Sequence, residues 1–172
     1  MIKIYPIQLF VAPSLCYFIG WGHDPEDENE VDFVLTRRKK LLLFDTCSSL
    51  RKYCSASAEK ICLVGSTAVF RAYRCREQIM LMHHQDGEAV DVINLLYDIL
   101  KTIAPQEIGQ ESLTGLWEFV QFATFDQNLS GFFAEKDNPS PESIVARIDR
   151  LLGFILVHSI LFTGQGTLGR SS

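Results

Sequence analysis

The segment best equipped for chemistry is an acidic run over residues 24–32, DPEDENEVD, which carries six carboxylates and neither Lys nor Arg. Alternating acidic residues are typical of calcium loops, and Asp24, Glu26 and Glu28 alternate here. An EF-hand loop also needs a glycine at its sharp turn and a glutamate at its twelfth position. The segment contains no glycine, and Pro25 interrupts it. A solvated loop or a partner contact is therefore favoured over a metal site, and we predict no metal and no cofactor.

Histidines and cysteines could also do chemistry, but their spacing matches no catalytic or metal-binding pattern. His83 and His84 are adjacent, so they do not share one face of a helix as paired ligands would. The five cysteines include no C-x-x-C pair, which argues against a zinc site. Residues 65–71, GSTAVFR, lack the remaining glycines and the lysine of a phosphate-binding loop. Acid–base catalysis needs a nucleophile and an orienting carboxylate matched to a base, so we predict that the chain is not an enzyme.

The charged residues are strongly segregated although the net charge is only −5. Residues 24–36 hold six acidic residues and no basic one, and residues 77–142 hold twelve acidic and two basic. Between these stretches, residues 37–76 hold ten basic and two acidic residues. The negative balance argues against nucleic-acid binding. Acidic stretches of this kind either coat solvated faces, which favours solubility, or steer and hold a basic partner.

We adopt the second interpretation and predict that acidic side chains of both stretches bind a basic protein. The predicted partner-binding residues are Asp24, Glu26, Asp27, Glu28, Glu30, Asp86, Glu88, Asp91, Asp98 and Glu118. Aromatic residues beside or within the acidic stretches could anchor such an interface; they are Trp21, Trp117, Phe132 and Phe133. The alternative for these aromatic side chains is a place in the core, which is the favoured interpretation for Trp117.

The first part of the chain is predicted to be β-structure. Apolar, β-branched and aromatic residues indicate strands at 2–11, 15–21, 31–36, 41–46 and, with a break at Gly65 and Ser66, within 61–73. The runs VDFVLT and LLLFDT are separated by the four basic residues RRKK, which predicts a hairpin.

Helices are predicted to follow, because apolar residues then recur at three- and four-residue spacing. The expected helices begin at a cap formed by Asp45 or Thr46, cover 88–103, follow Ser112 with an apolar stripe of Leu116, Phe119, Val120 and Ala123, and run from a cap at Ser140 to residue 162. Residues 131–141 are expected to form a loop. This order predicts an α+β fold, with an N-terminal antiparallel β-sheet packed against a C-terminal layer of α-helices. Residues 1–163 are predicted to form one globular domain and residues 164–172 a flexible Gly/Ser-rich tail.

The longest apolar run, LLGFILVHSILF at residues 151–162, has 12 residues, whereas a membrane-spanning helix needs about 20. It therefore predicts a buried helix in a protein that does not bind a membrane. The cysteines are best interpreted as reduced thiols, which favours a cytoplasmic location.

The order of segments resembles immunity proteins of bacterial polymorphic-toxin and contact-dependent growth-inhibition systems. The similar stretch covers residues 15–105: a strand ending in Trp21 and Gly22, an acidic loop, two strands around a basic turn, the short helix in LLLFDTCSSLRKYC and the amphipathic helix VDVINLLYDILKTI. The resemblance implies a cytoplasmic, non-enzymatic antitoxin. Such a protein binds the C-terminal domain of its cognate toxin one-to-one, and that domain is often a basic nuclease. The resemblance assigns no individual functional residue.

Two alternatives remain open from the sequence. One is a small-molecule-binding enzyme with a site between the sheet and the helices, which would show a deep pocket with perturbed titratable groups. The other is an adaptor that associates with its own kind through the apolar helix at residues 151–162.

Overall fold

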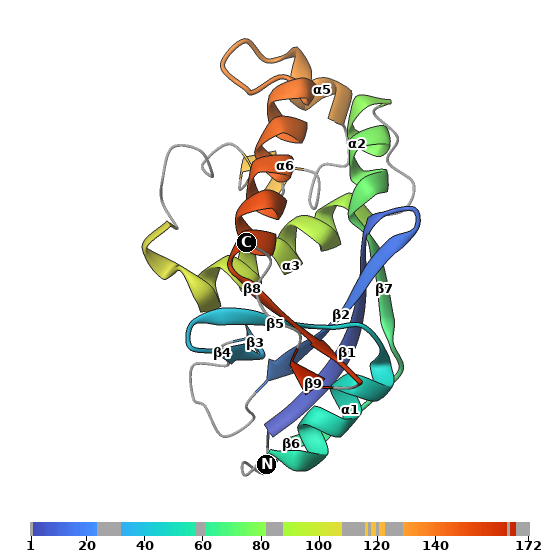
Figure 1. The fold of residues 1–172 in the computed structure, drawn as a ribbon. Helices are drawn as coiled ribbons and strands as arrows, with labels where there is room; N and C mark the ends of the chain where they lie inside the picture. Colours follow the sequence, from blue (N-terminus) through green and yellow to red (C-terminus); the bar gives the residue numbers. More distant parts are fainter. Residues whose placement is uncertain are drawn as a thin grey trace.

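The structure, a computed structural model, describes residues 2–23, 32–57, 61–81, 88–107, 116, 118–119, 121–122, 129–164 and 166–167. The strands are β1 (Ile2–Ala12), β2 (Leu15–His23), β3 (Asp32–Val34), β4 (Thr36–Arg37), β5 (Lys40–Phe44), β6 (Ile61–Leu63), β7 (Ala68–Arg71), β8 (Ser159–Thr163) and β9 (Gly166–Thr167). The helices are α1 (Cys47–Ala56), α2 (Ala72–Met80), α3 (Glu88–Ile103), α5 (Leu129–Ala134) and α6 (Pro141–Val157), with a 3-10 turn at Pro105–Glu107. The predicted α+β fold is confirmed (Figure 1).

The sheet is mixed, with the strand order β6-β1-β2-β5-β8-β9. The expected antiparallel pairing is present where neighbouring strands follow one another, as in β1–β2, β4–β5 and β8–β9. Parallel pairs arise where the chain returns to the sheet after a helix, as at β6 after α1 and at β8 after α6, and β7 continues in the direction of β6. β6 and β7 lie parallel to β1, and β8 lies parallel to β5. The prediction of an antiparallel sheet is therefore wrong for these pairs. A connection through a helix lets a strand return in the same direction as its neighbour.

The hairpin predicted at the four basic residues turns more tightly than expected. Arg37 pairs with Lys40, so only Arg38 and Lys39 form the loop. Both have left-handed backbones, with φ of 54° and 60°. Two residues of this kind match the right-handed twist of the flanking strands, although Asn-Gly is the usual sequence there. The turn therefore holds its basic side chains at an exposed tip.

Both faces of the sheet are buried, and β5 shows how one strand serves both. Leu41 and Leu43 join the larger hydrophobic cluster, which the helices α2, α3 and α6 complete. Leu42 and Phe44 point to the other face, where Leu50 and Cys54 of α1 cover them. Alternate side chains of a strand lie on opposite faces. Figure 1 accordingly shows α1 below the sheet and α2, α3, α5 and α6 above it.

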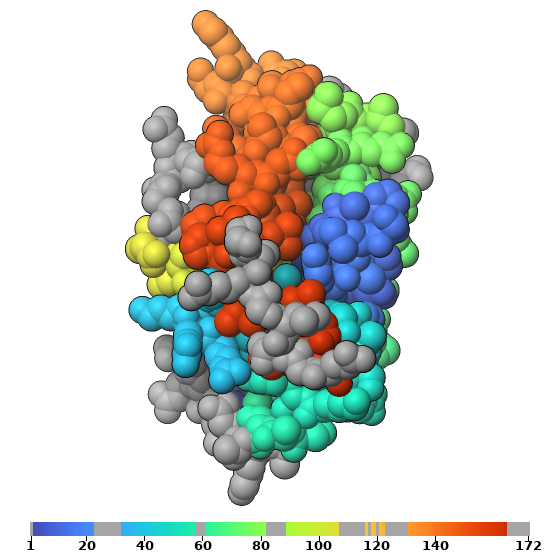
Figure 2. Space-filling view, viewed as in Figure 1, coloured from blue at the N-terminus to red at the C-terminus, as the bar shows by residue number. Residues whose placement is uncertain are grey.

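Within the helical layer, α3 and the start of α6 follow the predicted pattern. The side chains of α3 that were expected to recur on one face are buried, namely Val92, Leu95, Leu96, Ile99 and Ile103. The expected cap of α6 is confirmed, because Ser140 accepts a hydrogen bond from the Ser143 backbone N–H and Pro141 is the first helical residue. Arg76 of α2 forms an ion pair with Asp149 of α6 at 2.5 Å. In the space-filling view, α2, α5 and α6 form the upper part of the visible face, and α1 lies at the opposite end (Figure 2).

Two predicted segments at the C-terminal end differ from the structure. The helix expected to reach residue 162 ends at Val157, and Ser159–Thr163 forms β8 beside β5. Ile160, Leu161 and Phe162 are consecutive apolar residues, so their periodicity does not distinguish a buried helix from a strand buried on both faces. Residues 131–134, expected in a loop, belong to α5. Gly166 and Thr167, within the predicted tail, form β9 and pair with β8.

Within the described ranges, no helix combines the length and the apolar character that crossing a membrane requires.

Candidate functional site

The first candidate site lies where α3 crosses the edge of the sheet at β2 and β3. Trp21 of β2 points toward α3, and its indole Nε1 donates a hydrogen bond to Asp98 Oδ2 at 3.3 Å. The Tyr5 ring packs against the Trp21 ring, with centroids 5.7 Å apart. All three side chains are partly exposed. An aromatic pair and a carboxylate therefore share a half-buried position at the junction of sheet and helix.

The charged form of the Asp98 carboxyl is electrostatically unfavourable at this position. Burial raises the pKa of its carboxyl, and the hydrogen bond from Trp21 opposes that rise only in part. The negative charge of Asp32 raises the pKa of Asp98 further, whereas Lys101 lowers it. A carboxylate whose charge is disfavoured by burial is typical of functional sites, and structural ion networks can show the same effect.

The interaction between Asp32 and Asp98 joins the two acidic stretches of the sequence. Asp32, the last residue of the first acidic stretch to carry a charge, begins β3 and pairs with His23 at the end of β2. Asp98 belongs to α3, which packs against β3. Residues 66 positions apart in the chain thus place two carboxylates of the separate stretches within electrostatic reach of each other.

The predicted partner-binding residues fall into three groups. Asp24, Glu26, Asp27, Glu28, Glu30 and Asp86 lie outside the described residues. Glu88 is the first residue of α3, Asp91 is exposed on α3, and Asp98 is half-buried on the same helix. Asp91 and Asp98 are seven residues apart, so they lie on the same side of α3. Glu118 is exposed at a second place, an open depression beside α5.

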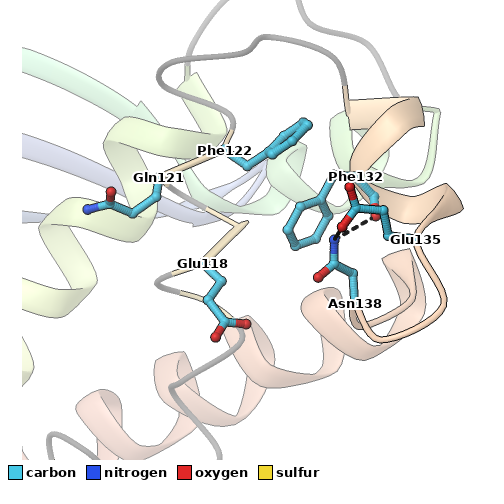
Figure 3. A pocket seen from close by; sticks show the side chains of 6 residues that line it. All are labelled: Glu118, Gln121, Phe122, Phe132, Glu135 and Asn138. Atoms are coloured by element: carbon cyan, nitrogen blue, oxygen red, sulfur yellow. Dashed lines mark hydrogen bonds between the residues drawn. The ribbon is translucent and has the colours of Figure 1, made fainter.

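The depression has a volume of about 530 Å³ and is lined by Glu118, Gln121, Phe122, Phe132, Glu135 and Asn138 (Figure 3). The first three have helical backbones, whereas the last three belong to α5 and the turn after it. The aromatic residue Phe132, a candidate anchor from the sequence, is 2 % exposed and lies in the core. Sequence reasoning missed Gln121, Phe122, Glu135 and Asn138, because a helix and a turn with no shared periodicity bring them together.

The other candidate metal ligands and nucleophiles are cysteine and histidine side chains. Among the residues that the structure describes, no group of three His, Cys, Asp or Glu side chains is arranged to hold a metal ion. All five cysteines are described and none forms a disulfide; Cys54 and Cys75 are buried, and burial raises the pKa of the Cys54 thiol. His158 caps the end of α6, where its Nδ1 donates to the Phe154 carbonyl at 2.8 Å.

The sequence matches no protein-family model and no curated protein. The fold is similar to that of a solved structure, the C-terminal domain of SatS in complex with bromine. The similarity has a TM-score of 0.58 and covers 93% of each chain, with 13% sequence identity. At this identity the likeness establishes the fold and nothing of the function.

Proposed function

We propose that this chain is an immunity protein that binds a basic toxin domain and blocks it one-to-one in the cytoplasm. The observation that carries the proposal is the meeting of Asp32 and Asp98 beside Trp21, where α3 joins the sheet. Lys101 is one cation near Asp98, yet the pKa of Asp98 remains raised, so a further cation would favour its charged form. A basic partner supplies that cation, and the half-buried Trp21 offers the aromatic contact that interface hot spots use.

A nuclease fits this chemistry best among basic partners. Its substrate face must attract phosphate groups, so it carries Lys and Arg in a groove or on a patch. An acidic surface binds such a face in place of the nucleic acid and excludes the substrate. The exposed Asp91, on the same side of α3 as Asp98, extends the acidic surface along the helix. The chain needs no catalytic residue for this role.

The structure changes one premise of the self-association alternative. That alternative required one apolar helix over residues 151–162, but α6 ends at Val157. Leu151 and Ile155 of that helix are buried in the larger hydrophobic cluster, and Leu161 of β8 packs against it. Part of the apolar run is thus used within the fold, whereas Val157 is 69 % exposed.

The test is capture of the partner. The tagged protein is used as bait in a lysate of its own bacterium at low salt, and the eluate is identified by mass spectrometry. The captured protein is then separated in denaturant, refolded and mixed with RNA and DNA, with and without the bait. We expect one stoichiometric basic protein that degrades nucleic acid only when the bait is absent. No stoichiometric partner, or a nuclease whose activity the bait leaves unchanged, would contradict the proposal.

A further inference from the structure

We infer that the depression lined by Glu118, Phe122, Phe132, Glu135 and Asn138 takes an arginine side chain of the basic partner protein. The inference rests on the proposed function for the nature of the partner. The chemistry of the depression itself can be tested without that partner.

The floor of the depression is aromatic and tightly packed. Phe132 lies 5.2 Å from Phe122 and 5.7 Å from Phe119 between ring centroids. Phe119 is completely buried and Phe122 is half-buried, so the Phe122 ring is the one that solvent reaches. Figure 3 shows the Phe122 and Phe132 side chains converging between the helical residues and α5. Ring faces of this kind attract a cation through their negative potential.

The rim presents acceptors. Glu118 and Glu135 are both exposed, and within the described part of the chain neither carboxylate has a lysine or arginine partner. The Asn138 side-chain Nδ2 donates both to the Phe132 carbonyl at 2.9 Å and to Glu135 Oε2 at 3.2 Å. Because these two acceptors fix the amide nitrogen, the Asn138 carbonyl oxygen faces the depression (Figure 3). A ligand that supplies several donors and a positive charge complements this lining.

A guanidinium group meets these requirements better than an ammonium group. It is planar and can lie on an aromatic face while its five N–H donors reach several acceptors at once. An ammonium is a compact, strongly hydrated charge with three donors. The volume of about 530 Å³ falls in the range of roughly 300–1,000 Å³ that is typical of ligand pockets. It exceeds one side chain, so the partner's backbone beside the arginine can enter as well.

The probe is N-acetyl-arginine amide, and its neutral isostere N-acetyl-citrulline amide is the control ligand. The intact protein, labelled with carbon-13 on its phenylalanine rings, is titrated with each and followed by NMR. We expect saturable shifts of the Phe122 and Phe132 ring signals with the arginine probe and none with citrulline. Glu118→Gln should weaken arginine binding about fivefold, the upper range for an exposed ion pair. Phe122→Leu, which keeps an apolar side chain, should weaken it about threefold.

Glu77→Gln is the matched control, because Glu77 is also an exposed helical glutamate but belongs to α2. It should bind the arginine probe as the wild type does. Equal shifts with arginine and citrulline, or a Glu118→Gln variant that binds as the wild type does, would overturn the inference. Equal affinity for N-acetyl-lysine amide would overturn the assignment to arginine.

The two proposals fail in distinguishable ways. If the arginine probe binds but capture yields no basic partner, the proposed function is wrong and the arginine site stands. If capture yields a basic partner but the probe does not bind, the arginine site is wrong and the proposed function stands.

Discussion

Asp45 and Asp98 are aspartates on opposite sides of one sheet, and their environments are opposite. Asp45 precedes α1 and accepts hydrogen bonds from Ser49 Oγ at 2.6 Å and from the Gly164 backbone N–H at 3.3 Å. These donors, Ser49 first, lower the pKa of Asp45. Asp98 on α3 has one donor, Trp21, and its pKa is raised, mainly by burial.

In Asp45 the folded state favours the charged carboxylate, whereas in Asp98 the folded state disfavours it. Asp45 links the start of α1 to the end of β8, so its charge favours the native state. Asp98 is kept in a place where burial and Asp32 outweigh the opposing effects of Trp21 and Lys101 on its pKa. Proteins retain such local conflicts mainly at functional sites. This is why we place the partner at the α3 side of the sheet and not at the α1 side.

The largest expected change in stability comes from core substitutions, which test whether the α1 side and the α3 side of the sheet are equally well packed. Leu50 on the α1 side and Leu96 on the α3 side are both fully buried. Replacement of either by alanine should lower the free energy of unfolding by about 2–5 kcal/mol, because each leaves a cavity in a packed core. Urea unfolding measures both. A loss below about 1 kcal/mol for Leu50→Ala would show that α1 is loosely attached and would break the comparison.

A smaller loss is expected when the Asp45 carboxylate is removed. Asp45→Ala deprives Ser49 and Gly164 of their acceptor, which should lower the free energy of unfolding by about 1 kcal/mol at neutral pH. The figure is modest because Asp45 is exposed and solvent screens its charge. Because the pKa of Asp45 is lowered in the folded state, the loss should be present above its ordinary pKa of 3.8 and should vanish as pH falls through the folded value. A loss that stays constant down to acid unfolding would contradict the charge-based explanation.

The smallest and opposite effect is expected at Asp98. Asp98→Asn keeps an acceptor for Trp21 but removes the charge, so the free energy of unfolding at neutral pH should rise slightly, by less than about 1 kcal/mol. A raised folded pKa penalises the fold above that pKa, and the penalty disappears as pH falls toward the ordinary value of 3.8. The gain of the variant should therefore fade on acidification, as thermal unfolding at several pH values would reveal. A destabilised Asp98→Asn protein would mean that the Asp98 charge supports the fold.

Local signals in the sequence predicted much of the fold. The strands at 2–11 and 15–21 and the cap at Ser140 were predicted because each depends on residues close in the chain, and of the two candidate caps Asp45 and Thr46, Thr46 is the cap. β8 was missed because its residues are apolar on both faces and only the free edge of β5 selects a strand. Of the candidate site, the sequence indicated the acidic composition. It did not indicate the contact of Trp21 with Asp98, since the two residues are 77 positions apart and no local pattern encodes their meeting.

The most direct test of a basic partner at the α3 side is the association rate of the captured partner with two charge-reversed variants. Asp91→Lys changes an exposed residue of α3, and Glu77→Lys makes the same change on α2 as the control. Circular dichroism would check that both variants are folded, and stopped-flow fluorescence would follow association at several salt concentrations. We predict that Asp91→Lys lowers the rate about tenfold at low salt and flattens its salt dependence, whereas Glu77→Lys changes it less than about twofold. Equal effects of the two variants, or no effect of Asp91→Lys, would contradict binding at the α3 side.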